Sequence, residues 1–90
     1  MGKMVNVGFT NMVSADRIIA IMTPDAAQTK RAIARAKEEG KFLDASHGRR
    51  TRSVIVMDSG HVIFSGLLPL TIGDRVSKNA VSAIKERDDD

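Results

Sequence analysis

Arg52-Ser53-Val54-Ile55-Val56-Met57 and Val62-Ile63-Phe64 are the two runs of sequence that decide the fold. The apolar part of each run is continuous and rich in β-branched residues, as in strands that are covered on both faces. Between the runs, Ser59-Gly60 is a two-residue connection of the kind that tolerates positive φ in a β-hairpin. The sequence therefore predicts a hairpin here.

Upstream of this hairpin, the sequence predicts a helix. Thr23-Pro24-Asp25 is a helix start, with Thr23 as N-cap and Pro24 in the first helical position. The helix runs to about Glu39, and Gly40 supplies the left-handed residue that follows a helix. A strand over 41–45 and a turn over 46–48 then lead into the hairpin.

The two ends of the chain add further strands and a second helix. Residues 4–9 alternate, as a half-buried strand does, 11–14 are a turn or a short strand, and 17–22 are a continuous apolar strand. After Pro69, which stops the sheet, Thr71 and Asp74 resemble a capping box. A last helix then passes through Val76, Ala80 and Ile84.

The element order is β-(β)-β-α-β-β-β-α, which predicts an α+β domain with a small, mostly antiparallel sheet and two helices. Residues 1–87 form a single domain, and the acidic tail 88–90 is a solvated end with no fold of its own.

Self-association is the expected means of reinforcing so small a domain. The chain has 90 residues and no Cys, so disulfides and thiolate metal sites are excluded. The first helix brings mostly alanine to the strands, so a neighbouring copy would cover one face of the sheet. The alternative is that both helices cover a single face. No run reaches the length of a membrane span and no signal peptide is recognisable, so we expect a cytoplasmic protein.

Positive charge is concentrated in the middle of the chain. The net charge is only +3, but residues 30–52 carry eight basic and three acidic residues, or +5, which leaves −2 for the rest. Such clustering is the electrostatic footprint of a nucleic-acid-binding protein. The basic residues of the first helix are Lys30, Arg31, Arg35 and Lys37, of which the first three are candidates for DNA contacts. A solvated helix face explains them equally well, with Glu39 placed to pair with Arg35.

The segment His47-Gly48-Arg49-Arg50-Thr51-Arg52 is the stronger candidate for a binding site. Arg49, Arg50 and Arg52 lie at a turn that leads into a strand, with no acidic residue between Asp44 and Asp58. Arginine suits bidentate contacts to phosphate or guanine. The alternative is an exposed basic turn with no partner. The chain has no Trp and no Tyr, and we expect its three Phe to be core residues, which favours duplex DNA over single strands or RNA.

Nothing in the sequence argues for an enzyme, a cofactor or a small-molecule substrate. Asp58, Ser59 and His61 are the residue types of a hydrolase triad, but they are nearly consecutive at a hairpin tip. A metal site built from His47, His61, Asp44 and Asp58 lacks any known ligand spacing.

Several stretches, in this order along the chain, closely resemble the RemA family of bacterial regulators. They are Asn6-Val7-Gly8-Phe9-x-Asn11, Ser14-Ala15-x-Arg17, Pro24 with Lys30-Arg31, Asp44-Ala45-x-x-Gly48-Arg49-Arg50-Thr51-Arg52, and Met57-Asp58-Ser59-x-His61-Val62-Ile63. The similarity covers residues 4 to 76. His47, where the family commonly has Tyr, and Leu68 and Leu70 are departures.

The resemblance implies a transcriptional regulator of matrix and biofilm genes, associated with the nucleoid. It also implies subunits similar to LytTR-type domains, assembled into rings that bind double-stranded DNA. By motif, the DNA-contacting arginines map onto Arg49 and Arg50, and a strand arginine linked to activity maps onto Arg17, our candidate for an intersubunit contact. The rival hypothesis is a ring-shaped scaffold for an acidic protein partner.

Overall fold

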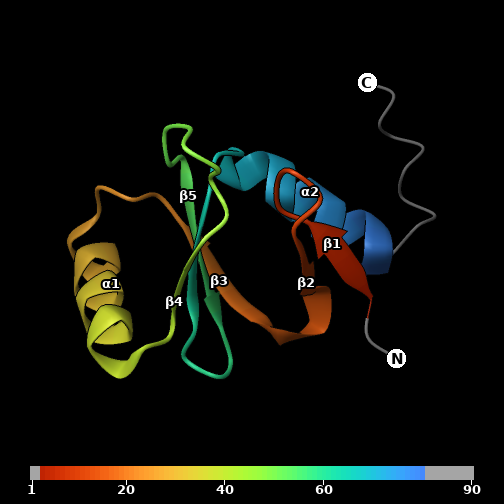
Figure 1. Cartoon of the computed structure of the whole chain (residues 1–90). Coiled ribbons are helices and arrows are strands. Elements are labelled where there is room, and N and C mark those ends of the chain that lie inside the picture. The colour runs from red at the N-terminus through yellow and green to blue at the C-terminus, as the bar shows by residue number, and fades with distance from the viewer. Residues whose placement is uncertain (1–2, 81–90) are drawn as a thin grey trace.

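The computed structural model describes residues 3–80, except for the side chains of 78–80, and it has the α+β architecture that the sequence predicts (Figure 1). Ile84 and the acidic tail lie outside the described residues. The elements are β1 (Met4–Asn6), β2 (Met12–Ser14), a 3-10 turn (Ala15–Arg17), β3 (Ile18–Met22), α1 (Ala27–Glu39), β4 (Phe42–Asp44), β5 (Ser53–Met57), β6 (Val62–Ser65) and α2 (Pro69–Ala80).

Four strands form the central sheet, in the order β3-β5-β6-β4, while β1 and β2 form a separate antiparallel pair. Within the central sheet, β5 is antiparallel to both β3 and β6, and β4 is parallel to β6. In Figure 1, α1 covers one side of this sheet, and α2 together with the β1–β2 pair covers the other.

The hairpin of β5 and β6 forms as predicted, with Val54 opposite Phe64 and Ile55 opposite Ile63. Its connection has three residues rather than two, because Val56 pairs with Val62 and the Met57 amide donates to the His61 carbonyl at 2.9 Å. Gly60, at φ 94°, takes the positive-φ position that such a longer loop requires.

Each face of the sheet has its own core, which explains the continuous apolar runs. On the α1 side, the fully buried Val54 and Val62 pack with Ala36. On the α2 side, Ile55 packs with Ile72 and with the residues of β1. The two helices therefore do not share a face, and neither face of the central hairpin is left for a neighbouring copy to cover.

Strand β3 differs from the prediction that it is covered on both faces. A register shift lies between Ile18 and Ala20, so Ile19 sits in a bulge at the edge of the sheet and is 65% exposed. A bulge re-aims a side chain and protects an edge strand from indiscriminate pairing.

Both helix starts lie elsewhere than predicted, whereas the end of α1 is confirmed. Thr23 is not the N-cap: Ala26 precedes α1, with no side-chain cap, and Thr29, in the first turn of the helix, is buried. Gly40 ends α1 at φ 72°. Since Pro69 is the first residue of α2, Thr71 lies inside that helix and caps nothing.

Within the described part of the chain, neither helix has the length and apolar character needed to cross a membrane.

Candidate nucleic-acid interface

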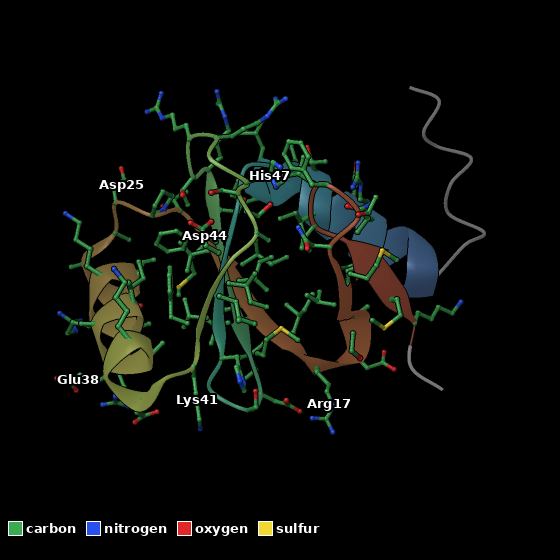
Figure 2. The ribbon with its side chains drawn as sticks, in the orientation of Figure 1. Arg17, Asp25, Glu38, Lys41, Asp44 and His47 are labelled. Carbon is green, nitrogen blue, oxygen red and sulfur yellow. The ribbon has the colours of Figure 1, made fainter. Side chains whose placement is uncertain are left out.

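Residues 45–52 connect β4 to β5, and within them residues 46–52 form an irregular loop that we call the arginine loop. It projects beyond one end of the sheet, where nitrogen-tipped side chains spread outward (Figure 2). Arg49, Arg50 and Arg52 are all exposed, and none of them is paired with a carboxylate of the described residues. The backbone is irregular at 48–50, which allows adjacent arginines to face the same side.

Short-range hydrogen bonds hold the loop in its bent shape. One carboxylate oxygen of Asp44 accepts from the Ser46 amide at 2.9 Å and from its hydroxyl at 2.6 Å. The Arg49 amide then donates to the Ser46 carbonyl at 3.0 Å, and the Arg52 amide donates to the Ser65 carbonyl at 2.9 Å. His47 and Gly48 turn the chain with φ of 57° and 81°. These hydrogen bonds give the arginine loop a defined conformation.

The conformation of this turn should be sensitive to acid, because it depends on the ionised carboxylate of Asp44. The hydroxyl and amide of Ser46 both donate to it, which holds the pKa of Asp44 below its usual range. A carboxyl whose pKa is depressed in the folded state stabilises that state above its unfolded pKa, near 3.9, and the contribution is lost as the pH falls through the folded pKa. We expect the hydrogen-exchange protection factors of the Ser46 and Arg49 amides, which correct for the pH dependence of intrinsic exchange, to fall only below about pH 4. A carbon-detected titration of the Asp44 carboxyl at or above the ordinary pKa would contradict this.

Beside the arginine loop lies an aromatic side chain that the sequence did not place there. Phe9 was expected in the core of a strand, but β1 ends at Asn6, and Phe9 lies in the following turn with 45% of its surface exposed. Its ring stacks on the imidazole of His47, with centroids 4.4 Å apart, and the Arg49 guanidinium lies 5.0 Å from its centroid. Figure 2 shows His47 beside this turn. The premise that all three Phe are core residues is therefore wrong.

Two asparagines shape the turn that presents Phe9. The Gly8 amide donates to the Asn6 side-chain oxygen at 2.6 Å, and the Asn11 side-chain amide donates to the Gly8 carbonyl at 2.9 Å. Phe9 and Thr10 both adopt left-handed backbone, with φ of 50° and 63°. The Asn6-x-Gly-Phe-x-Asn11 motif is therefore the set of residues that builds this turn.

Thr10→Gly is expected to stabilise the protein. A β-branched residue at φ 63° is strained, and left-handed backbone costs about 1–2 kcal/mol for a residue with a Cβ. Glycine also has more conformational entropy in the unfolded chain, which offsets part of this gain. We therefore expect a net increase of roughly 0.5–1 kcal/mol in the free energy of unfolding, measured by urea titration. Thr23→Gly, at negative φ, is the matched control and should be destabilising. Equal losses in the two variants would contradict the assignment of strain.

Two basic residues of α1, Arg31 and Arg35, lie at the other end of the sheet. Arg31 and Arg35 line an open groove of about 550 Å³ together with Lys41 and the hairpin residues Asp58 and Ser59. The arginine loop precedes β5 and the hairpin turn follows it, so the two sites are separated by roughly the 17 Å length of a five-residue strand. Lys30, also exposed, does not line this groove.

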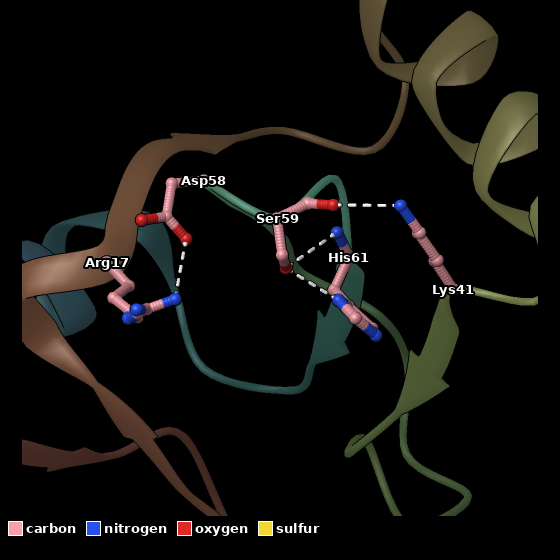
Figure 3. Close-up of polar contacts among 5 residues, drawn as sticks. All are labelled: Arg17, Lys41, Asp58, Ser59 and His61. Carbon is pink, nitrogen blue, oxygen red and sulfur yellow. Dashed lines mark hydrogen bonds and ion pairs between the residues drawn. The ribbon is translucent and has the colours of Figure 1, made fainter.

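The charges around this groove are only sparsely paired. Among the described residues, Glu39 forms no ion pair with Arg35, and the ion pair present joins Arg17 to Asp58 across 3.4 Å. Lys41 donates to the Ser59 carbonyl at 3.0 Å, and Figures 2 and 3 place Lys41 and Arg17 near this hairpin, away from the arginine loop. Five of the six predicted DNA-binding residues therefore lie on two separate surfaces, the arginine loop and this groove, and Lys30 belongs to neither.

The hairpin tip contains part of a hydrolase-like arrangement. Ser59 Oγ lies 2.6 Å from His61 Nδ1, closer than its position at a hairpin tip suggested, but the Asp58 carboxylate is bonded to Arg17 and not to the imidazole (Figure 3). Among residues 3–80, no three His, Cys, Asp or Glu side chains gather where they could hold a metal ion.

Comparison with known proteins extends the motif resemblance over most of the chain. The model of the RemA-like family, "Extracellular matrix regulatory protein A-like", matches residues 4–76. A relative from Geobacillus kaustophilus is 57% identical over 76 residues, covering 84% of this chain and 87% of the relative. One from Cyanothece sp. is 52% identical over 73 residues (81% and 80% of the two chains), and one from Pelotomaculum thermopropionicum is 50% identical over 88 residues (97% of each). All three carry the name "Putative regulatory protein". This chain therefore belongs to the RemA-like family of regulatory proteins.

Proposed function

We propose that this protein is a transcriptional regulator that binds duplex DNA through its arginine loop, as a ring-shaped homo-oligomer. Genes of the matrix or biofilm type are its expected targets, and the nucleoid is its expected location. The observation that carries the proposal is the group of three exposed arginines on one loop, without a carboxylate partner among the described residues. Membership of a family of regulators supports the same function.

The arginine side chains of the loop are suited to binding the phosphate backbone and the grooves of a DNA duplex. A guanidinium offers a planar fork of donors that matches phosphate and guanine edges, and Arg side chains are attracted into narrow minor grooves. The irregular backbone of the loop lets Arg49 and Arg50 meet one surface, which a regular strand would prevent. Arg52 adds a third charge beside them, while Lys30, Arg31 and Arg35, which lie on α1, would contribute less.

Assembly would compensate for the weakness of a single site. One loop with a few phosphate contacts binds weakly, but linked copies engage one duplex at high effective concentration. Apolar side chains that remain exposed on the single chain, among them Ile19, Leu43 and Leu70, support burial against further copies. In this proposal the protein has no catalytic activity, cofactor or small-molecule substrate.

The test is a fluorescence-anisotropy titration of labelled duplex DNA at several salt concentrations. We expect binding whose log K falls steeply with log[salt], by about 0.9 for each phosphate neutralised. Polyglutamate of similar length serves as the comparison ligand for the rival proposal, a scaffold for an acidic protein. Binding of polyglutamate as tight as that of DNA, with the same salt slope, would favour the rival.

A further inference from the structure

We infer that Phe9 is a positioning residue of this interface, because its ring, stacked on His47, holds the Arg49 guanidinium ready for the DNA. The inference rests on the proposed function and assigns roles within the same site. It divides the arginines into one that is preorganised, Arg49, and two that are free to adapt, Arg50 and Arg52.

The geometry around Arg49 constrains its side chain along its whole length. At its base, the Arg49 Cβ lies beside Gly66, where an added Cβ would be in ordinary van der Waals contact with it at 3.5 Å. At its tip, the guanidinium lies 5.0 Å from the Phe9 centroid, within the range of a cation–π attraction. Phe9, Arg49 and Gly66 border the same small cavity, of about 240 Å³.

The backbone supports an active role for Phe9 over incidental packing. A bulky residue at φ 50° is an outlier, and strain of this kind persists only where the surrounding structure imposes it and tends to cluster at functional sites. Almost half of the ring remains exposed, so hydrophobic burial alone does not account for its placement. The strained turn instead presents the ring to two loop residues, His47 and Arg49.

The arrangement lowers the entropic cost of binding. A free arginine side chain loses up to about 2 kcal/mol of rotamer freedom when it is immobilised, and a side chain already held loses less. No ring or carboxylate of the described residues holds Arg50 or Arg52 in this way. Arg49 should therefore depend on Phe9, whereas Arg52 should not.

A double-mutant cycle on duplex binding at low salt, where weakened variants remain measurable, tests this dependence. Phe9→Leu removes the aromatic face and keeps an apolar side chain, and we expect affinity to fall roughly two- to fivefold for each engaged subunit. Phe9→Tyr should restore it. In the Arg49→Ala background Phe9→Leu should have almost no further effect, while in the Arg52→Ala background it should retain its full effect.

The free protein supplies a second measurement that does not depend on DNA. The NMR signal of the Arg49 Nε–H group should move and sharpen toward that of a mobile side chain in Phe9→Leu, with thermal unfolding near that of the wild type. Failure of the wild type to bind DNA would refute the proposed function and leave this measurement valid. An unmoved Arg49 signal, or an equal effect of Phe9→Leu in both arginine backgrounds, would overturn the inference.

Discussion

Replacement of Arg49 or Arg50 by alanine is expected to abolish tight binding of duplex DNA and to leave the fold and the oligomer unchanged. Each arginine that neutralises a phosphate contributes about 0.9 to the slope of log K against log[salt], and the contribution is multiplied by the number of engaged subunits. A small loss in each subunit therefore becomes a near-complete loss in the assembly. Both side chains are exposed, so their removal opens no cavity in either core.

A salt series decides the outcome. Arg49→Ala and Arg50→Ala should reduce both the affinity and the slope, while circular dichroism and light scattering match the wild type. Arg31→Ala and Arg35→Ala remove the same charge at the groove beside the hairpin turn, at the other end of β5, and are the matched controls, with smaller expected effects. If the slope is unchanged in the loop variants and reduced in the controls, the DNA-binding site lies on α1.

The features that the sequence predicts well are those that depend on neighbouring residues. Gly40 ends α1 because the left-handed residue after a helix is a local requirement, and the β5–β6 hairpin follows from two apolar runs around a glycine turn. Thr23-Pro24-Asp25 has the residue types of a helix start, yet α1 begins four residues after Thr23, at Ala27, and has no side-chain cap. Local cap preferences are weak compared with tertiary packing, so they do not fix where a helix begins.

The candidate site likewise has one part that local sequence predicts and another that only the fold reveals. The arginine loop can be found from the sequence, because three of four consecutive residues are arginine and no acidic residue lies nearby. Charge clustering could not separate Arg31 from Arg49, because only the fold places them at opposite ends of β5. The alternation of Phe9 with Val5 and Val7 predicts a strand. The contrary signal in the sequence is the pair of asparagines on either side of Gly8, whose side chains bond to the Gly8 backbone and form a turn.

Arg17→Ala and Ile19→Asp are expected to dissociate the proposed oligomer. Arg17 ends the 3-10 turn that leads into the edge strand β3, and Ile19, within β3, is 65% exposed in the single chain. Burying an isoleucine against a neighbour contributes about 1.5–3 kcal/mol, and a buried aspartate adds an unpaired charge, so assembly should be lost at micromolar concentration. Light scattering should then return the mass of a monomer.

Asp58→Ala is the control that separates a role between subunits from one within the chain. The ion pair of Arg17 with Asp58 is exposed, with 64% and 49% of the two side chains accessible, and such pairs contribute at most about 1 kcal/mol to stability. If Arg17 acts only through this pair, Arg17→Ala and Asp58→Ala should behave alike. If it contacts a neighbouring copy, only Arg17→Ala should dissociate the assembly, and DNA affinity should fall with it because the arginine loops are no longer linked. An oligomer that survives both Arg17→Ala and Ile19→Asp would place the interface elsewhere, with the exposed Leu43 and Leu70 as the next positions to test.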